Sequence, residues 1–521
     1  EISACLVGSE MCIRDRGILG FIERIGNKIP DITILFISAF LLVCVVSAVL
    51  AQIHFNYVHP ATGRPIEITN MLSGKALVDL MSKMVTNYAN FPPLSMVIVA
   101  TLGIGIADGS GYINTGLKKI LSITPKVLIT PVVILVGMLS HLGPDSGYVI
   151  IIPIAAYMFY AVGKHPLAGI AASFAGIAGA FAANYTPSAI DPVIQGFTQS
   201  AAQIIDPGYQ VNVLCNYFYA FASTFIVIGA CWWVTEKITN PWLWKACPLD
   251  DDLDLGNENN SSITPSENRA FKIATAVLLL MLTGLAAALY PADSILRAPD
   301  GVIASFKAPI MQSIVSLIFI LAALVGLVYG IACGKFKSPK DVTAAMEEIT
   351  KTLVQLIVFY FFAAQFLYAF GASNMGALIA VSGAEFLKSL NLPPQVTVFG
   401  IIVFVALLNL IITSASAKWA ILAPIFVPML MAVGIAPELT QVAFRVSDSA
   451  VNVVTPMFAF YPLIILYCQK YVKNAGIGTL SSMMLPYTIA LLVSLTFMLY
   501  LFWWLDIPLG FQADYVYPRR F

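Results

Sequence analysis

The chain has 521 residues, of which 59% are hydrophobic and only 11% are charged. Because a soluble domain carries about 25% charged residues, this composition excludes a string of soluble modules. The 28 basic and 28 acidic side chains cancel, so a nucleic-acid-binding protein with a basic surface is excluded as well. Mean hydropathy is +0.85, and several apolar runs are long enough, or nearly so, to cross about 30 Å of hydrocarbon. The composition therefore predicts an all-α polytopic membrane protein.

The chain opens with the polar stretch CLVGSEMCIRDR. We interpret residues 1–16 as a non-native leader and exclude them from functional reasoning. Nine apolar segments then have the length of a transmembrane helix. They are residues 31–52, 93–112, 166–199, 211–236, 270–292, 308–333, 351–371, 437–467 and 479–505. Lys and Arg are more frequent in the connections that share a side with the N-terminus, and this bias predicts a cytoplasmic N-terminus.

An acidic segment rich in Asn and Ser, residues 249–269, lies near the middle of the chain. Its composition is typical of a disordered linker, and the predicted orientation places it in the cytoplasm. It divides the chain into two halves of comparable length. We expect the first half to cover residues 17–248 and the second to cover residues 270–521.

Two further apolar regions are broken by polar tips. Residues 127–163 are interrupted by SHLGPDSG, and residues 398–434 are interrupted by TSASAK. Each arm is shorter than the ~20 residues that a crossing helix needs, and the tips contain residues that end helices. A pair of tilted spans with a surface loop is the alternative. Re-entrant hairpins keep Lys126 and Lys164 on the inner side, in agreement with the charge bias, and we therefore predict hairpins.

The two hairpin regions also resemble each other. They align without a gap when Ala161–Gly163 is placed on Ala432–Gly434. The matched pairs include Tyr148 with Trp419, Pro153 with Pro424, and Pro166 with Pro437. On the predicted topology the hairpins enter from opposite sides, which makes an inverted repeat. Interrupted segments at corresponding places in two halves are typical of a secondary transporter with its site at the bilayer midplane.

The segment after the first hairpin contains NYTPSAIDP, from Asn184 to Pro192. Its two prolines remove backbone donors and break a helix, which lipid tolerates only where protein or water meets the freed groups. Free carbonyls beside Asn184 and Asp191 would make a cation site of oxygen ligands. A kinked helix that reaches the surface near Asp191 is the alternative.

The segment after the second hairpin carries charges where the bilayer disfavours them. Arg445, Asp448, Asn452 and Thr455 follow a helical spacing and would form one stripe. A mid-span Arg costs at least a few kcal/mol, so it should face the protein interior and have a partner. An Arg445–Asp448 pair is one interpretation. We favour an Arg445 that binds a substrate carboxylate through two parallel hydrogen bonds, and an Asp448 that binds an ion or a proton.

Residues of the second hairpin complete the candidate site. The indole of Trp419 could stack on an aromatic ligand, or it could pack at the hairpin shoulder. The tip residues Ser414 and Ser416 could donate to a second carboxylate. Asn409 could complete an oxygen cage near Asp448, with a helix–helix hydrogen bond as the alternative. Lys418 could attract anions or extend its amine to the membrane surface.

With these residues assembled, the chain resembles the p-aminobenzoyl-glutamate transporter family (AbgT) from about Gly17 to its end. The likeness is carried by SHLGPDSGYVIIIPIAA, by AANYTPSAIDP and by SASAKWAILAPIFVPMLMAVGIAPELTQVAFRVSDSAVNVVTPM. The resemblance implies a homodimer in the bacterial inner membrane, with nine spans and two hairpins per protomer. It also implies cation-coupled transport of p-aminobenzoyl-glutamate, with export of sulfonamide antimetabolites by some members and an elevator-type motion.

The resemblance further implies roles for individual residues. The substrate residues would be Trp419, Pro437 and Arg445. The ion-linked residues would be Asp448, Asn409 and Asp191. We add Ser414 and Ser416 to the substrate set, and Asn184, Asn452 and Thr455 to the ion set.

The sequence therefore predicts a symporter or antiporter that moves p-aminobenzoyl-glutamate, related aromatic carboxylates or sulfonamide-type antimetabolites, driven by H⁺ or Na⁺. A sodium/dicarboxylate symporter is the alternative, and such a site needs no aromatic stacker. An intramembrane peptidase would need a catalytic motif around Asp191 and Asp448, and we find none. A passive channel is disfavoured by charges placed behind hairpins. We expect no enzyme activity, no cofactor beyond a coupling ion, and as partners a small anion and the lipid bilayer.

Overall fold

The computed structural model describes residues 32–58, 63–140, 146–188, 190–249, 263–303 and 307–518. The predicted leader and most of the predicted linker lie outside these residues. The regular secondary structure of the described residues is helical, and the β-structure among them is limited to isolated bridges such as Ile435 with Val516. The all-α prediction is therefore confirmed.

Within the described ranges, seven helical segments are long and apolar enough to cross a membrane, or nine if each sharply bent helix pair is one span. The seven correspond to seven of the nine predicted spans. They contain α2 (Ile32–Leu50), α4 (Pro92–Ser110), α10 (Tyr217–Val234), α12 (Pro265–Leu289), α14 (Ile314–Ala332), α16 (Val354–Ala372) and α22 (Ile477–Trp504). A π-helical turn, η4 (Thr235–Thr239), joins α10 to the short α11 (Asn240–Ala246).

The other two predicted spans are each broken into two short helices. The first consists of α8 (Pro166–Ala178) and α9 (Ile190–Ala202), so the break predicted around Pro187 is present. The second consists of α20 (Pro437–Val451) and α21 (Tyr461–Gln469). The single helical stripe predicted as far as Thr455 is wrong, because α20 ends before it. Pro456 disfavours helical backbone at the preceding residue and has no N–H to donate.

Both predicted hairpins are present. The first consists of α6 (Ile129–Leu139), preceded by the short η2 (Lys126–Leu128), and α7 (Ser146–Ala161). The second consists of α18 (Pro394–Asn409) and α19 (Ala415–Met431). Sharp bends lead into them, of 120° after α5 (Tyr112–Ser122) and of 116° after α17 (Met375–Ser389). Such bends are typical of re-entrant segments and support that interpretation.

Several helices were not predicted from the apolar runs. They are α3 (Gly74–Ala89), α5, α15 (Pro339–Lys351) and α17, while the short α13 (Pro309–Gln312) lies at the start of the predicted span 308–333. These segments mix apolar and polar residues along the helix, as in GKALVDLMSKMVTNYA of α3, so a search for uninterrupted apolar runs does not find them.

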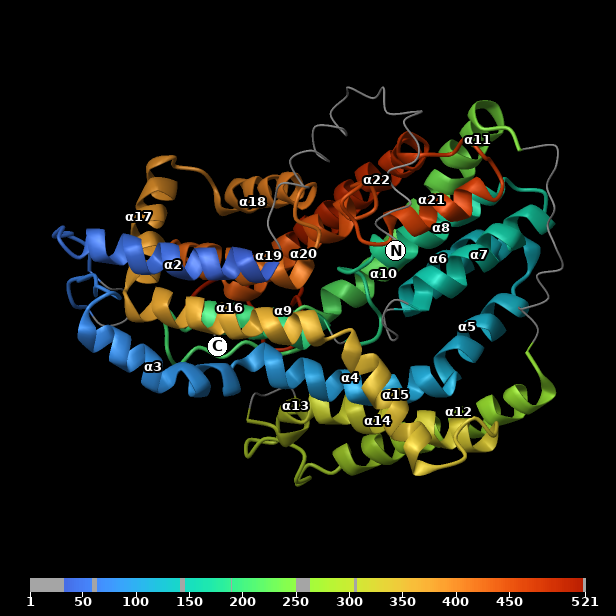
Figure 1. Cartoon of the computed structure of the whole chain (residues 1–521), viewed down its shortest axis with the longest axis horizontal. Helices are drawn as coiled ribbons and strands as arrows, with labels where there is room; N and C mark the ends of the chain where they lie inside the picture. Colours follow the sequence, from blue (N-terminus) through green and yellow to red (C-terminus); the bar gives the residue numbers. More distant parts are fainter. Residues whose placement is uncertain are drawn as a thin grey trace.

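The two halves pack in corresponding ways. In the first half α6 and α7 pack against α8, and in the second half α18 and α19 pack against α20. The halves also exchange contacts, because α19 packs against α9 and α21 contacts α7 and α8. Figure 1 shows α19 beside α9 and α21 beside α8. Each broken span therefore contacts both hairpins, and this arrangement brings the two hairpin tips to one place.

Candidate functional site

A cavity of about 450 Å³ lies where the hairpin tips meet the breaks in α8–α9 and α20–α21. The first hairpin contributes Ser140, Gly147 and Tyr148, and the second contributes Thr413 to Ser416. The two breaks contribute Phe181, Ser188, Asn452 and Phe458 to Phe460, and α4 and α16 close the remaining side with Val97, Thr101, Ile104 and Leu356. The predicted residues Ser414, Ser416 and Asn452 thus face one cavity.

Three helices begin at the cavity wall. Gly147 lies in the first turn of α7, Ile190 begins α9, and Ser414 is the N-cap of α19. The Ser414 hydroxyl accepts a hydrogen bond from the backbone N–H of Ala417 at 3.4 Å. Helix N-termini carry a partial positive charge and free N–H groups. The described cavity lining contains no charged side chain, so these helix ends and hydroxyls are the polar groups that the wall presents.

One part of the wall is aromatic. Tyr148 stacks on Phe460 with ring centroids 4.2 Å apart and an interplanar angle of 6°. Phe458 lies 5.7 Å from Tyr148, between centroids. Tyr148 is not among the site residues predicted from the sequence, although the internal alignment pairs it with Trp419. That pairing is the signal that could have identified it.

Arg445 is paired with Asp191 and not with Asp448. Its Nη1 lies 2.7 Å from Asp191 Oδ1, and its Nη2 donates to the carbonyl oxygen of Phe181 at 2.8 Å. Asp191 also accepts hydrogen bonds from the N–H of Ser188 at 2.7 Å and from its hydroxyl at 3.0 Å. The proposed Arg445–Asp448 pair is therefore wrong, because α9 and α20 pack together and bring Asp191 to the guanidinium. Phe181 and Ser188 line the cavity, so this ion pair lies directly behind the wall.

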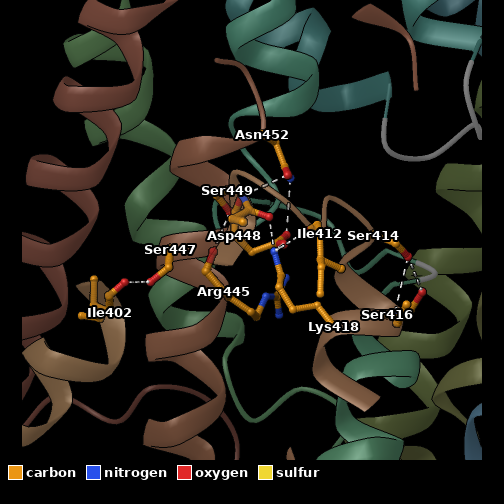
Figure 2. A network of polar contacts seen from close by, with 12 residues as sticks. Ile402, Ile412, Ser414, Ser416, Lys418, Arg445, Ser447, Asp448, Ser449 and Asn452 are labelled. Carbon is orange, nitrogen blue, oxygen red and sulfur yellow. Dashed lines mark hydrogen bonds and ion pairs between the residues drawn. The ribbon is translucent and has the colours of Figure 1, made fainter. Parts of the chain in front are cut away.

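A second buried ion pair joins Lys418 to Asp448. Lys418 Nζ lies 2.7 Å from Asp448 Oδ1 and 3.2 Å from the carbonyl oxygen of Ile412, and it also donates to Asn409 Oδ1. Asn409 Nδ2 donates to the Asp448 carbonyl at 2.9 Å and to Asn452 Oδ1 at 3.1 Å. Figure 2 shows the Lys418 side chain pointing toward Asp448. The expectation that Lys418 extends to the surface is wrong because its side chain is fully buried, and the attraction of anions by Lys418 stays a prediction.

Trp419 and Pro437 lie away from the cavity lining. The Trp419 side chain is fully buried, stacks on Phe444 with centroids 4.4 Å apart, and donates from Nε1 to Thr198 Oγ1 at 2.9 Å. Thr198 in turn donates to Gln441 at 2.6 Å. Pro437 is buried at the first position of α20. In this conformation both residues belong to the packed core, and the predicted ligand contact of Trp419 stays a prediction.

The remaining predicted residues surround these ion pairs. Thr455 donates to the carbonyl of Leu410 at 2.8 Å. Asn184 is buried, and neither of its amide atoms has a hydrogen-bond partner among the described residues. It faces a void of about 10 Å³ that Asp191 and Arg445 also line, a volume close to that of one water. The structure thus brings Asn184 to the Arg445 pair, and Asn409 and Asn452 to the Lys418 pair.

The family model described as "AbgT putative transporter family" matches residues 17–517. The chain belongs to the AbgT family. It is 32% identical over 502 residues to the p-aminobenzoyl-glutamate transport protein of Escherichia coli (strain K12), and the match covers 96% of each chain. The protein is therefore a multi-pass membrane transporter of this family and not an enzyme.

Two solved AbgT structures have the same fold. The chain is 39% identical to Neisseria gonorrhoeae MtrF, with a TM-score of 0.89 and coverage of 96% of this chain and 100% of MtrF. It is 37% identical to the Alcanivorax borkumensis YdaH transporter, with a TM-score of 0.87 and coverage of 92% and 100%. MtrF is described as illuminating a class of antimetabolite efflux pumps, and YdaH as having an unusual topology.

Proposed function

We propose that this AbgT protein is a secondary active transporter of p-aminobenzoyl-glutamate and related aromatic carboxylates, with sulfonamide-type antimetabolites as further ligands. The cavity between the two hairpin tips carries the proposal, because it combines helix N-termini for carboxylates with an aromatic wall. A volume of about 450 Å³ lies in the range that drug-sized ligands occupy. The names of the relatives indicate the same ligand class.

The ligand chemistry fits the two sides of the cavity. The glutamate carboxylates would bind at the start of α19, where Ser414 and Ser416 supply hydroxyls. The aminobenzoyl ring would pack against Tyr148 and Phe460. Arg445 would contact a carboxylate when its hydrogen bond to the Phe181 carbonyl is exchanged for one to the ligand, since Phe181 lines the cavity.

We propose that a cation gradient drives transport, by H⁺ or Na⁺ acting at the buried polar residues beside the cavity. The hairpins and broken spans would move together in an elevator-type motion relative to the outer helices. The protein would act as a homodimer in the bacterial inner membrane, with its N-terminus in the cytoplasm.

A sodium/dicarboxylate symporter is the second candidate, and the aromatic wall argues against it. Replacement of Tyr148 by Leu removes the ring that stacks on Phe460, while Tyr148→Phe keeps it. Loss of a stacked aromatic contact costs about 0.5–1.5 kcal/mol beyond buried area. We expect Tyr148→Leu to raise the KM for p-aminobenzoyl-glutamate in proteoliposomes severalfold, and Tyr148→Phe to keep it near wild type.

Succinate uptake provides the matched ligand control. If the protein carries succinate as well as p-aminobenzoyl-glutamate, and Tyr148→Leu affects neither, the dicarboxylate function is correct. If neither ligand is bound or moved by the wild-type protein, the proposed cavity does not serve this ligand class.

A further inference from the structure

The environment of the Lys418 amine resembles the ligand set of an alkali cation. Lys418 lies in the first turn of α19 and its side chain has no exposed surface. Its Nζ is surrounded by a carboxylate oxygen of Asp448 at 2.7 Å, the Ile412 carbonyl oxygen at 3.2 Å, and the Asn409 amide oxygen. The Ile412 carbonyl is free for this contact because α18 has already ended at Asn409. In secondary transporters, unwound backbone carbonyls of this kind coordinate Na⁺ or H⁺.

The other groups near Nζ do not neutralise the positive charge of the Lys418 ammonium. The Phe444 ring lies 5.6 Å from Nζ and presents a face that attracts cations. Among the described residues, Asp448 of α20 is the carboxylate that lies within ion-pair distance of Lys418 Nζ. The other charged side chains of the packed elements α9 and α20 are Asp191 and Arg445, which pair with each other, and Glu438, which accepts hydrogen bonds from Tyr209. The element α17, which packs on α19, carries the exposed Glu385 and Lys388. The cage, formed by the oxygens of Asp448, Ile412 and Asn409 around Nζ, therefore holds one positive charge and one negative charge.

We propose that the Lys418 ammonium occupies, as part of the chain, the place that a sodium ion would take, so that the coupling ion is a proton carried by Lys418. This inference rests on the proposed transport function. A sodium ion would need the same three oxygens and would be repelled by the ammonium. In the coupling step one N–H bond of the ammonium breaks, the electron pair stays on nitrogen, and the proton goes to water. One positive charge leaves the cage, and protonation from the opposite side restores it.

The cage is connected to the ligand cavity. Asn452 lines the cavity, accepts a hydrogen bond from Asn409 at 3.1 Å, and donates to Asp448 at 3.4 Å. Nζ joins the two arms of the second hairpin, since Ile412 and Asn409 belong to the first arm and Lys418 to the second. A neutral amine keeps two N–H donors but loses the charge, so loss of the proton would weaken this link directly behind Ser414 and Ser416. Protonation and ligand binding would thus act on the same hairpin tip.

The test compares wild type with Lys418→Ala, and uses the exposed Lys388→Ala as the matched control. In Lys418→Ala the three oxygens are open to a free cation. We expect Na⁺, against an equal concentration of K⁺, to raise the melting temperature of purified Lys418→Ala but not of wild type or Lys388→Ala. We also expect wild-type uptake to respond to a pH gradient and not to a Na⁺ gradient, and Lys418→Ala to lose the pH response.

Na⁺ stabilisation of wild type, Na⁺-driven uptake by wild type, or pH-driven uptake by Lys418→Ala would each overturn the proposal. If Lys418→Ala does not fold, the double variant Lys418→Ala with Asp448→Asn removes the uncompensated charge. Uptake that still follows the pH gradient in this double variant contradicts the role of Lys418. Failure of wild type to bind or exchange p-aminobenzoyl-glutamate without any gradient would instead reject the transport function itself.

A second hollow, of about 610 Å³, lies at the base of the first hairpin and carries an independent inference. Lys126 and Lys164 come from the two ends of the hairpin, and Trp233, Glu236 and Lys237 come from α10 and η4. Lys164 is paired with Glu236. In the described ranges, Lys126 and Lys237 have no carboxylate within ion-pair distance, and both are exposed.

We infer that this hollow binds the phosphate headgroup of an anionic phospholipid. Two free ammonium groups complement a phosphate diester, and basic hollows between membrane helices are typical sites for anionic headgroups. Trp232 and Trp233 are 38% and 59% exposed beside the lysines, as expected for aromatic rings at a membrane interface. A lipid bound here would tie the base of the first hairpin to α10.

The test measures the melting temperature of the purified protein with added phosphatidylglycerol, with phosphatidylcholine, and with inorganic phosphate. We expect phosphatidylglycerol alone to raise it, and the double variant Lys126→Ala with Lys237→Ala to lose this response. Lys388→Ala is the control and should respond as wild type does. An equal response in the double variant, or an equal effect of inorganic phosphate, would reject the lipid site.

Discussion

At the scale of single residues, the site contains two buried basic side chains, Arg445 and Lys418, and each is paired with a carboxylate. The sequence identifies Arg445, Asp448, Asn409 and Asp191 as polar residues that lipid disfavours. It does not reveal which groups pair, because Asp191 and Arg445 are far apart in the chain and meet only through the packing of α9 on α20. The burial of Lys418 was not predictable either, since a lysine beside a polar hairpin tip is equally typical of a surface position.

Single and double variants of the Arg445–Asp191 pair distinguish a loss of stability from a loss of transport. Arg445→Ala leaves the Asp191 carboxylate buried without its partner, and such a change costs about 3–5 kcal/mol of stability. We expect Arg445→Ala to lower the melting temperature and abolish uptake of p-aminobenzoyl-glutamate. Arg445→Ala combined with Asp191→Ala should recover stability but not uptake. Recovery of uptake in the double variant would mean that Arg445 does not contact the substrate.

Trp419 is the residue for which sequence and structure lead to different expectations. Trp419→Phe keeps an aromatic ring against Phe444 but removes the N–H that donates to Thr198. From its burial we expect a loss of about 1 kcal/mol in stability and an unchanged KM for p-aminobenzoyl-glutamate. Thermal unfolding and uptake kinetics of the same preparation measure both quantities. A strongly raised KM at unchanged stability would support the ligand contact predicted from the sequence.

At the scale of elements, the position of the first hairpin depends on its close packing against α8. A Cβ atom on Gly176 would lie 2.5 Å from the carbonyl oxygen of Ile134 in α6. Because a backbone atom cannot move aside cheaply, we expect Gly176→Ala to cost about 1–3 kcal/mol and to reduce uptake. The melting temperature in one detergent measures the first effect.

Gly229→Ala is the matched control, since a Cβ there meets no atom within 4 Å. Alanine favours helix over glycine by about 1 kcal/mol, so Gly229→Ala should keep or raise the melting temperature. Equal behaviour of the two variants would contradict the tight α6–α8 contact.

The sequence predicted elements well where hydrophobicity or proline determines them. Long apolar runs predict seven spans, and Pro187 lies in the break between α8 and α9, whereas Pro192 lies in the first turn of α9. Apolar runs do not predict the amphipathic helices α3 and α15. Helical spacing alone also predicts too long an α20, because Pro456 disfavours helix at the residue before it and α20 ends at Val451. The position of Tyr148 at the cavity follows from its packing with Phe460, and in the sequence only its alignment with Trp419 indicates it.

At the scale of the whole molecule, the two halves form one site only together. Each hairpin packs on the broken span of its own half, while α9 and α21 contact the hairpin of the other half. The cavity is therefore lined by both halves, and motion of either hairpin changes it. This arrangement suits a carrier that exposes one site alternately to the two sides, and it does not suit a continuous pore.

Accumulation of radiolabelled p-aminobenzoyl-glutamate in proteoliposomes tests this claim most directly. A carrier coupled to a proton gradient raises the internal ligand concentration above the external one, and a protonophore that abolishes the gradient releases the excess. We predict accumulation of this kind, saturable by unlabelled ligand. Uptake that stops at equal concentrations under every gradient, with single-channel currents, would contradict the account and indicate a passive channel.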